Sequence, residues 1–131
     1  MRFFMPSLFT LCLLICSCSS DQRVGVKGNV TYKGQAISNA TIRFEADGKG
    51  SEGGANIENG AFVIPKDKGL LPGNYKVQIN MADPKQKAGK DEAPGTGPIA
   101  KELLPRKYNL ETTLKATVEA GKDNQVDFKL D

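Results

Sequence analysis

The sequence of 131 residues contains no histidine and no tryptophan, and its three cysteines all lie within the first 18 residues. Without histidine, neither a Ser-His-Asp nor a Cys-His catalytic arrangement is available, and histidine-ligated metal sites are excluded. Beyond residue 18 there is no thiol to form a disulfide or to act as a nucleophile. Two carboxylates suffice for glycosidase chemistry, but a single small domain leaves little room for an enclosing cleft. The sequence therefore predicts a non-catalytic protein without a cofactor or a metal ion.

A strong excess of charge is also lacking. The chain has 18 basic and 15 acidic residues and a formal net charge of +3. Arg2 belongs to the leader described next, which leaves 18 − 1 = 17 basic residues against 15 acidic ones. Proteins that bind nucleic acids usually gather basic residues on one face and stack bases on aromatic rings. Here the lysines are scattered, so the sequence predicts no nucleic-acid partner.

The N-terminus has the pattern of a bacterial lipoprotein signal. One basic residue is followed by an apolar run, MRFFMPSLFTLCLLI, that suits a signal-peptide core and is short for a permanent membrane helix. Cys18 has Ile15 three residues before it and the small Ser17 directly before it, which resembles the lipobox. Cys16 is the alternative, although the bulky Ile15 precedes it. An ordinary secretory signal and an uncleaved anchor helix remain as further alternatives.

The lipobox implies a signal peptide over residues 1–17, a lipidated tether over residues 18–22 and one domain over residues 23–131. A diacylglyceryl group on the Cys18 thiol, with palmitate-type chains and an acylated N-terminus, would hold the domain on a membrane, because several acyl chains anchor durably. Ser19 follows the cysteine in place of an aspartate. By resemblance to sorting in Gram-negative bacteria, this favours the outer membrane, facing either the periplasm or the cell surface.

The pattern of the remaining chain predicts short strands separated by turns. Apolar residues alternate with polar ones in short runs bounded by glycine, proline and asparagine, which is typical of antiparallel β-proteins. Asn59-Gly60 predicts a tight hairpin between two of these runs. The segment 82–101 has little to bury and predicts a long, mobile surface loop. Seven strands are expected, over residues 23–33, 40–45, 54–57, 61–64, 75–80, 114–118 and 125–130.

Seven short strands bury their apolar faces most simply in two stacked sheets. The predicted fold is therefore an all-β, seven-stranded antiparallel β-sandwich of prealbumin-like or immunoglobulin-like type.

Three stretches together resemble a known family. GNVTYKGQAISNATIRF, ENGAFVI and GLLPGNYKVQI, within Val24 to Met81, are similar to the carboxypeptidase regulatory-like, or transthyretin-like, domain. The ending LLPRKYNLETTLKATVEAGKDNQVDFKL is similar to that of small envelope lipoproteins common in planctomycetes. The resemblance implies a prealbumin-like sandwich without catalytic activity of its own.

Two candidate sites stand out. Tyr75 follows Pro72-Gly73 and suits a structural tyrosine corner, in which the hydroxyl bonds to upstream backbone. Arg106, Lys107 and Tyr108 offer the side-chain types that anchor protein interfaces, or they help to close the sandwich. In the long loop, the carboxylates of Asp83, Asp91 and Glu92 lack the spacing of a calcium-binding loop. The lysines of the same loop, Lys85, Lys87 and Lys90, either contact lipid headgroups or are simply solvated.

These features predict a lipid-anchored module of the cell envelope with a structural or protein-interaction role. Its expected partners are the membrane, through the N-terminal lipid, and an envelope protein. Two alternatives remain open, which are a β-sandwich that binds carbohydrate or another envelope ligand, and an accessory subunit of a transport or secretion assembly.

Overall fold

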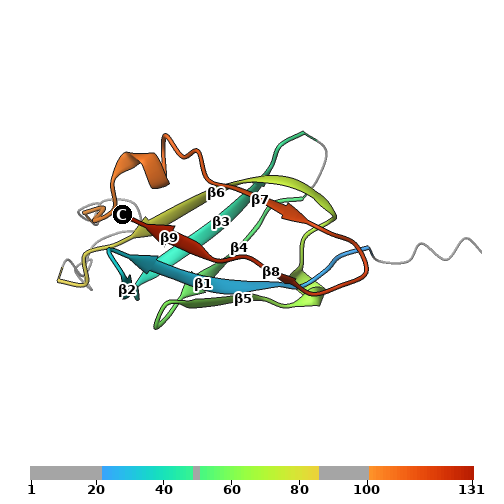
Figure 1. The fold of residues 1–131 in the computed structure, drawn as a ribbon, viewed down its shortest axis with the longest axis horizontal. Helices are drawn as coiled ribbons and strands as arrows, with labels where there is room; N and C mark the ends of the chain where they lie inside the picture. The colour runs from blue at the N-terminus through green and yellow to red at the C-terminus, as the bar shows by residue number, and fades with distance from the viewer. Residues whose placement is uncertain (1–21, 49–50, 86–100) are drawn as a thin grey trace, which may run out of the picture.

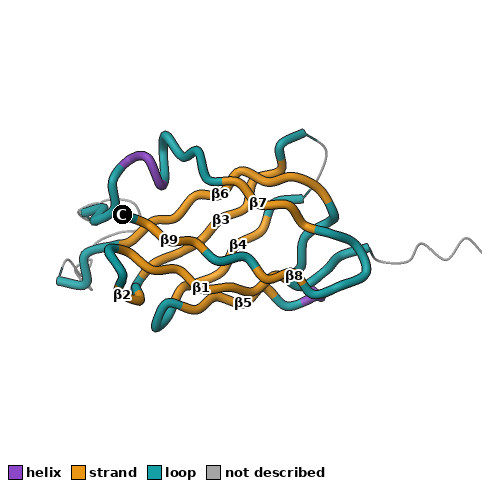
Figure 2. The backbone as a smooth tube through the Cα atoms, in the orientation of Figure 1, coloured by secondary structure: helices purple, strands orange, loops and turns teal. Residues whose placement is uncertain are grey.

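The computed structural model describes residues 22–48, 51–85 and 101–131 (Figure 1). The all-β prediction is confirmed, because these residues form strands and only two short 3₁₀ helices (Figure 2). The elements are β1 (Val26–Tyr32), β2 (Gln35–Ala36), β3 (Ala40–Ala46), β4 (Gly53–Ile57), β5 (Ala61–Ile64), η1 (Lys66–Lys68), β6 (Gly73–Met81), η2 (Arg106–Tyr108), β7 (Lys115–Val118), β8 (Asn124–Gln125) and β9 (Phe128–Leu130).

The strands form two sheets that pack in a sandwich-like arrangement. One sheet has the order β4-β3-β6-β7, and the other is built around β1, which pairs with β2, β5, β8 and β9. In β1 and β3 every second residue is buried, so one row of apolar side chains from each strand faces the core. The rings of Phe44 on β3 and Phe62 on β5 lie 6.0 Å apart between centroids and join the two sheets.

The C-terminal strands differ from the expectation of one antiparallel strand over residues 125–130. The described residues hold nine strands rather than seven, and both β8 and β9 pair with β1 in parallel. The ladder is interrupted at Val126-Asp127, where a Cβ atom on Gly28 would lie 1.7 Å from the Val126 carbonyl oxygen. The Asp127 carboxylate accepts a hydrogen bond from the Asn29 amide at 2.8 Å. The Asp127 side chain thus takes the place of a main-chain acceptor at Asn29, while the Val126 amide still donates to the Lys27 carbonyl oxygen at 2.9 Å.

The Asn59-Gly60 turn has the expected geometry, but the hairpin prediction is wrong. Both residues have positive φ, and Glu58 and Ala61 exchange two backbone hydrogen bonds of 3.0 and 2.9 Å. Beyond this bridge β4 pairs with β3, whereas β5 pairs with β1. The turn therefore carries the chain from one sheet to the other. A two-residue turn at Lys33-Gly34 makes a hairpin of β1 with the short β2, which is not among the seven expected strands.

The elongated sandwich has two distinct ends. At the entry end, Gln22 leads into the domain beside η1 and the turn at residues 120–123 (Figure 1). At the opposite, C-terminal end lie η2 and the C-terminus (Figure 1). The stem of the expected 82–101 loop is closed by a bridge between Ala82 and Glu102, while residues 86–100 lie outside the described residues.

Candidate functional site

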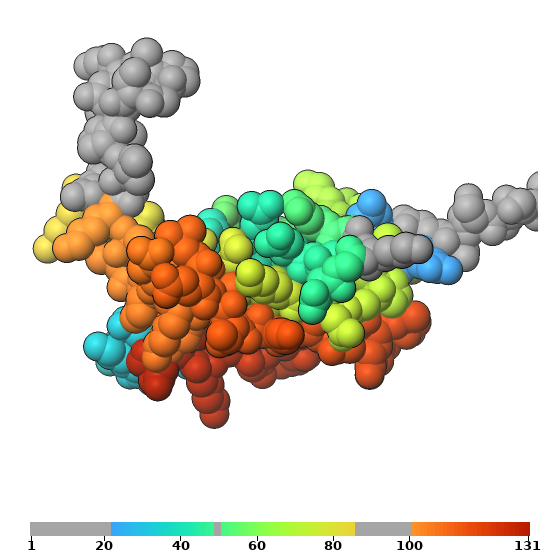
Figure 3. All heavy atoms as spheres, turned by 90° about the horizontal axis from the view of Figure 1, so that it is seen from above, coloured from blue at the N-terminus to red at the C-terminus, as the bar shows by residue number. Residues whose placement is uncertain are grey.

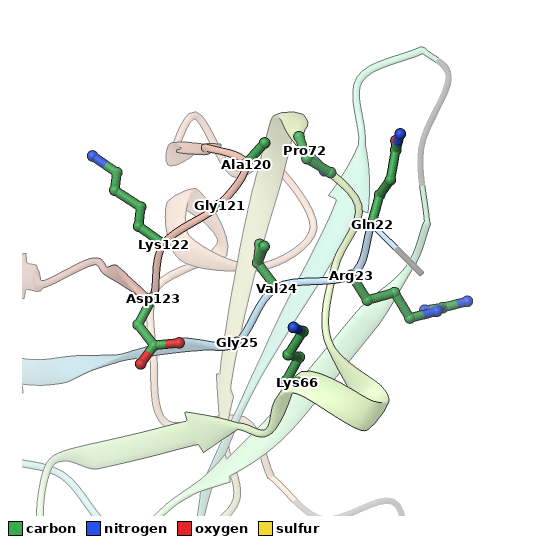
Figure 4. A pocket seen from close by; sticks show the side chains of 10 residues that line it. All are labelled: Gln22, Arg23, Val24, Gly25, Lys66, Pro72, Ala120, Gly121, Lys122 and Asp123. Atoms are coloured by element: carbon green, nitrogen blue, oxygen red, sulfur yellow. The ribbon is translucent and has the colours of Figure 1, made fainter. Parts of the chain in front are cut away.

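A hollow of about 640 Å³ opens at the entry end of the domain (Figure 4). Two of its cationic side chains, Arg23 and Lys122, have partners of their own. Arg23 donates from Nη1 to the Gly69 carbonyl oxygen at 2.9 Å, and Lys122 forms an ion pair with Glu119. In Figure 4 the side chains of Arg23 and Lys122 point away from one another. These two cations are therefore not brought together in the hollow.

Tyr75 lies in the core beneath the segment that precedes β6. Its side chain is buried, and its ring packs edge-on against Phe44 with centroids 6.3 Å apart. The hydroxyl donates a 2.6 Å hydrogen bond to the carbonyl oxygen of Leu71, four residues upstream. Ser51 Oγ lies 3.3 Å from the same hydroxyl and accepts a hydrogen bond from the Leu71 amide at 3.0 Å. The three residues form one network that fixes the entry into β6.

Arg106, Lys107 and Tyr108 form η2 at the C-terminal end, and their side chains lie in different environments. Tyr108 is only 5% exposed, so its ring is not offered to a partner. Arg106 and Lys107 are exposed and form ion pairs with Glu111 at 3.0 Å and Asp131 at 2.9 Å, respectively. The part of the predicted interaction surface that solvent reaches therefore consists of Arg106 and Lys107.

Asp131 is a partner of η2 that the sequence analysis did not single out. The Tyr108 hydroxyl donates a short hydrogen bond to the Asp131 carboxylate and accepts one from the Asp131 amide at 2.9 Å. The Lys107 ammonium group lies 4.8 Å from the centre of the Tyr108 ring. The hydrogen bond from Tyr108, followed by that from Lys107, lowers the pKa of Asp131 to about 2. The hydrogen bond to Asp131 raises the pKa of Lys107.

Three buried polar residues also escaped the sequence analysis, because their roles depend on contacts that no local pattern displays. Thr112 Oγ1 donates to the Val77 carbonyl oxygen at 2.6 Å and accepts from the Leu114 amide at 3.1 Å. Asn124 bonds the Glu119 amide and carbonyl groups through its side chain and so closes the turn before β8. Asn109, directly after η2, donates from its side chain to the Pro105 carbonyl oxygen at 3.4 Å and accepts from the Leu110 amide at 2.8 Å. Each acts on the chain's own backbone.

Several residues named in the sequence analysis lie outside the described part of the chain. They are Cys16, Cys18, Lys87, Lys90, Asp91 and Glu92. Asp83 and Lys85 are described, and the Asp83 carboxylate accepts a hydrogen bond from the Lys85 amide at 2.9 Å. Within residues 22–48, 51–85 and 101–131, no three acidic, histidine or cysteine side chains gather as metal ligands would. The same residues include no helix long and apolar enough to span a bilayer.

Comparisons with known proteins give a partial likeness to a solved structure. No family model matches the chain, and no curated protein matches its sequence. Among solved structures, it is similar to a DUF3823 family protein from Bacteroides ovatus ATCC 8483, with 15% sequence identity and a TM-score of 0.42. The match covers 82% of this chain and 43% of that protein, so this chain spans less than half of that protein's length.

Proposed function

We propose that this protein is a non-catalytic module of the bacterial cell envelope, held on a membrane by a lipid on Cys18 and acting through contact with an envelope protein. Its family would be that of the carboxypeptidase regulatory-like, or transthyretin-like, lipoproteins, on the strength of the motifs between Val24 and Met81. The two-sheet, all-β fold is compatible with that family.

The observation that best supports this role is the separation of the two ends. The chain enters the domain at Gln22, four residues after Cys18, and the exposed Arg106 and Lys107 lie at the other end (Figure 1). A lipid on Cys18 would therefore hold the entry end next to the membrane. The long axis of the sandwich would then direct the C-terminal end away from the bilayer.

The surface near η2 has the composition of a contact site. Leu110 is 74% exposed and Leu103 is 37% exposed, and they flank the exposed Arg106 and Lys107 in sequence. We call these four residues the C-terminal patch. Arginine is enriched among the residues that anchor interfaces, and exposed apolar surface rimmed by polar residues marks contact sites. Such a patch favours a protein partner over a small molecule.

A non-catalytic role agrees with the chemistry of the described interior. Its buried polar side chains, apart from the two tyrosines, are Asn109, Thr112 and Asn124, and all three bond to backbone groups. Catalytic acids and bases usually show their role through burial and a displaced pKa. The displaced pKa values of Lys107 and Asp131 belong to an exposed pair at the surface.

The anchor is tested by intact mass spectrometry of the protein purified from native membranes. We expect a chain that begins at Cys18 and carries the mass of acyl chains. Cys18→Ala should abolish that mass, whereas the control Cys16→Ala should retain it. A mature chain without acyl mass, or acylation lost only in Cys16→Ala, would contradict the proposed anchor site.

The contact role is tested by photo-crosslinking in intact cells. A photoreactive residue replaces Lys107 in the C-terminal patch or, as the matched control, Lys66 at the entry end. We expect one reproducible protein adduct from position 107 that position 66 does not give. The absence of any adduct specific to position 107 would count against a partner at this end.

A further inference from the structure

The outer face of the β4-β3-β6-β7 sheet carries polar side chains in place of apolar ones. Thr41 and Arg43 on β3 and Asn56 on β4 alternate with buried residues and point outward, and Asn80 does so on β6. The register places Thr41 between Asn56 and Asn80 in one row across three strands. Figure 3 shows segments of this sheet at the surface beside the C-terminal segment in orange. The row is rich in hydroxyl and amide groups.

Two hollows lie next to each other on this face, over β3 and β4. One, of about 460 Å³, is lined by Ser38, Asn39 and Asn59 at the strand ends, and the other, of about 490 Å³, by Arg43, Glu52 and Gly54. Thr41 and Asn56 line both hollows and lie between them, and we call the two hollows together the trough. Both hollows are open to solvent.

The floor of the trough depends on a glycine. Gly54 occupies an exposed position of β4 opposite Arg43, and as a glycine it adds no side chain to this part of the trough. A Cβ atom there would lie 2.6 Å from the Ile42 carbonyl oxygen, so the two backbones approach too closely for a larger residue. Asn39, at a bend, and Asn59, in a tight turn, lie at the strand-end side of the trough, and both have positive φ. Backbone geometry therefore shapes the trough in advance of any ligand.

The charged side chains of the trough carry no net positive charge, because Glu58 adds a carboxylate to the ion pair of Arg43 with Glu52. Among the described residues, the side chains of Asn39, Thr41 and Asn56 form no hydrogen bond with the protein. Arg43 is neutralised by Glu52 through an ion pair of 2.9 Å. An anion would find no unpaired cation in the described lining, and an apolar ligand would find no exposed large apolar side chain. Hydroxyl and amide groups match a ligand that presents many neutral hydroxyls.

We propose that this trough, from Asn39 and Asn59 through Thr41 and Asn56 to Arg43, binds a neutral oligosaccharide. Sugar hydroxyls would exchange hydrogen bonds with the side chains of Thr41 and Asn56 at the centre. Because the lining includes no aromatic ring for stacking, binding by one domain is weak, with a Kd on the order of 1 mM. The inference does not rest on the lipid anchor or on the C-terminal patch.

The test is a titration of the full chain, labelled with ¹⁵N and purified in detergent, with neutral oligosaccharides. The probes are maltohexaose, cellohexaose, xylohexaose and N-acetylchitohexaose at millimolar concentrations. We expect at least one of them to shift the amide signals of Thr41, Gly54 and Asn56 and to leave that of Lys66 in place. Such a pattern would place the ligand over β3 and β4.

Two variants and one control make the assignment specific. Asn56→Ala and Thr41→Val each remove side-chain hydrogen bonding from the centre of the trough, and each should weaken binding about two- to tenfold. Gln125→Ala removes an exposed amide from the other sheet and should leave binding unchanged. The amide spectrum of each variant shows whether it is folded, and either trough variant suffices for the test.

Several outcomes would overturn the proposal. They are no shift with any of the four sugars, shifts that centre on the entry end, and binding that both trough variants retain in full. The peptide ATIRFEA, which has the sequence of β3, serves as a competing probe. If the peptide alone shifts the β4 amides, the edge of β4 accepts an extended peptide and the trough is not a sugar site.

Discussion

The network around the Tyr75 hydroxyl allows a sharp test of what holds the start of β6. Tyr75→Phe keeps the buried ring and its edge-on contact with Phe44, and it removes only the hydroxyl. The Leu71 carbonyl then loses its 2.6 Å hydrogen bond, and Ser51 loses its neighbour at 3.3 Å. The change therefore isolates hydrogen bonding from packing.

The expected loss of stability follows from the burial of these groups. A typical protein hydrogen bond contributes about 0.5–1.5 kcal/mol net, and leaving a buried acceptor unpaired costs about 1–3 kcal/mol. Leu71 is only half-buried, so water can satisfy its carbonyl in part. We therefore expect Tyr75→Phe to lower the free energy of unfolding by about 1–2 kcal/mol. For a domain of this size, each 1 kcal/mol lowers Tm by about 4–8 °C.

Urea unfolding of the purified chain measures this loss. Tyr32→Phe is the matched control, because Tyr32 is half-buried and its hydroxyl has no hydrogen-bond partner within the described ranges. Ser51→Ala should also destabilise, and the double variant should lose less than the sum of the two single losses, because the groups share one network. If Tyr75→Phe and Tyr32→Phe agree within about 0.3 kcal/mol, the hydroxyl does not hold this segment.

Three further predictions concern contacts made by the residues after position 108. Gly28→Ala should cost about 3 kcal/mol or more in urea unfolding, because the new Cβ would meet the Val126 carbonyl at 1.7 Å, whereas Gly25→Ala, with its nearest contact at 3.3 Å, should be milder. Thr112→Val removes the bond to Val77 and should cost about 1–3 kcal/mol in the same assay; a loss below 0.5 kcal/mol would contradict that role. The Asp131 pKa, measured by NMR titration of its carboxyl carbon, should be about 2 and should return toward 3.8 in Tyr108→Phe. Since this pKa is lowered on folding, its stabilising effect is present above pH 3.8 and is lost as the pH falls toward 2, and an unchanged pKa in the variant would refute the assigned cause.

The strands themselves were largely predictable, because their signal is local. Val26 and Val30 alternate with exposed residues, as the period of two requires, and β5 occupies the same residues that the sequence predicted. The pairing of strands was less accessible. Asn59-Gly60 encodes the turn, yet whether two strands remain together after a turn depends on the partners that compete for each of them. Here β4 pairs with β3, whereas β5 pairs with β1.

The break between β8 and β9 was also not predictable from the local sequence. Val126, Phe128 and Leu130 alternate without interruption in the sequence, which favoured one continuous strand. The interruption arises from the close approach to Gly28, almost a hundred residues earlier, where the missing side chain lets the backbones meet. A glycine in a strand pattern indicates such an approach, but it does not name the segment that approaches.

The candidate sites follow the same division between local and distant contacts. The Tyr75 hydrogen bond spans four residues and belongs to a recognisable local pattern, whereas Tyr108 and Asp131 are 23 residues apart and meet only in the fold.

The trough is harder still to predict, because its parts are ordinary when they are considered singly. Outward-facing Thr41 and Asn56 look like solvated strand residues, and Gly54 looks like a weak point in a strand. We propose them as a site because the register sets Asn56 opposite Thr41 and Gly54 opposite Arg43. A shift of the register by one residue would point the side chains of Thr41 and Asn56 toward the core, and it would destroy both the fold and the trough. The pairing that buries the apolar face therefore also fixes the arrangement of the polar one.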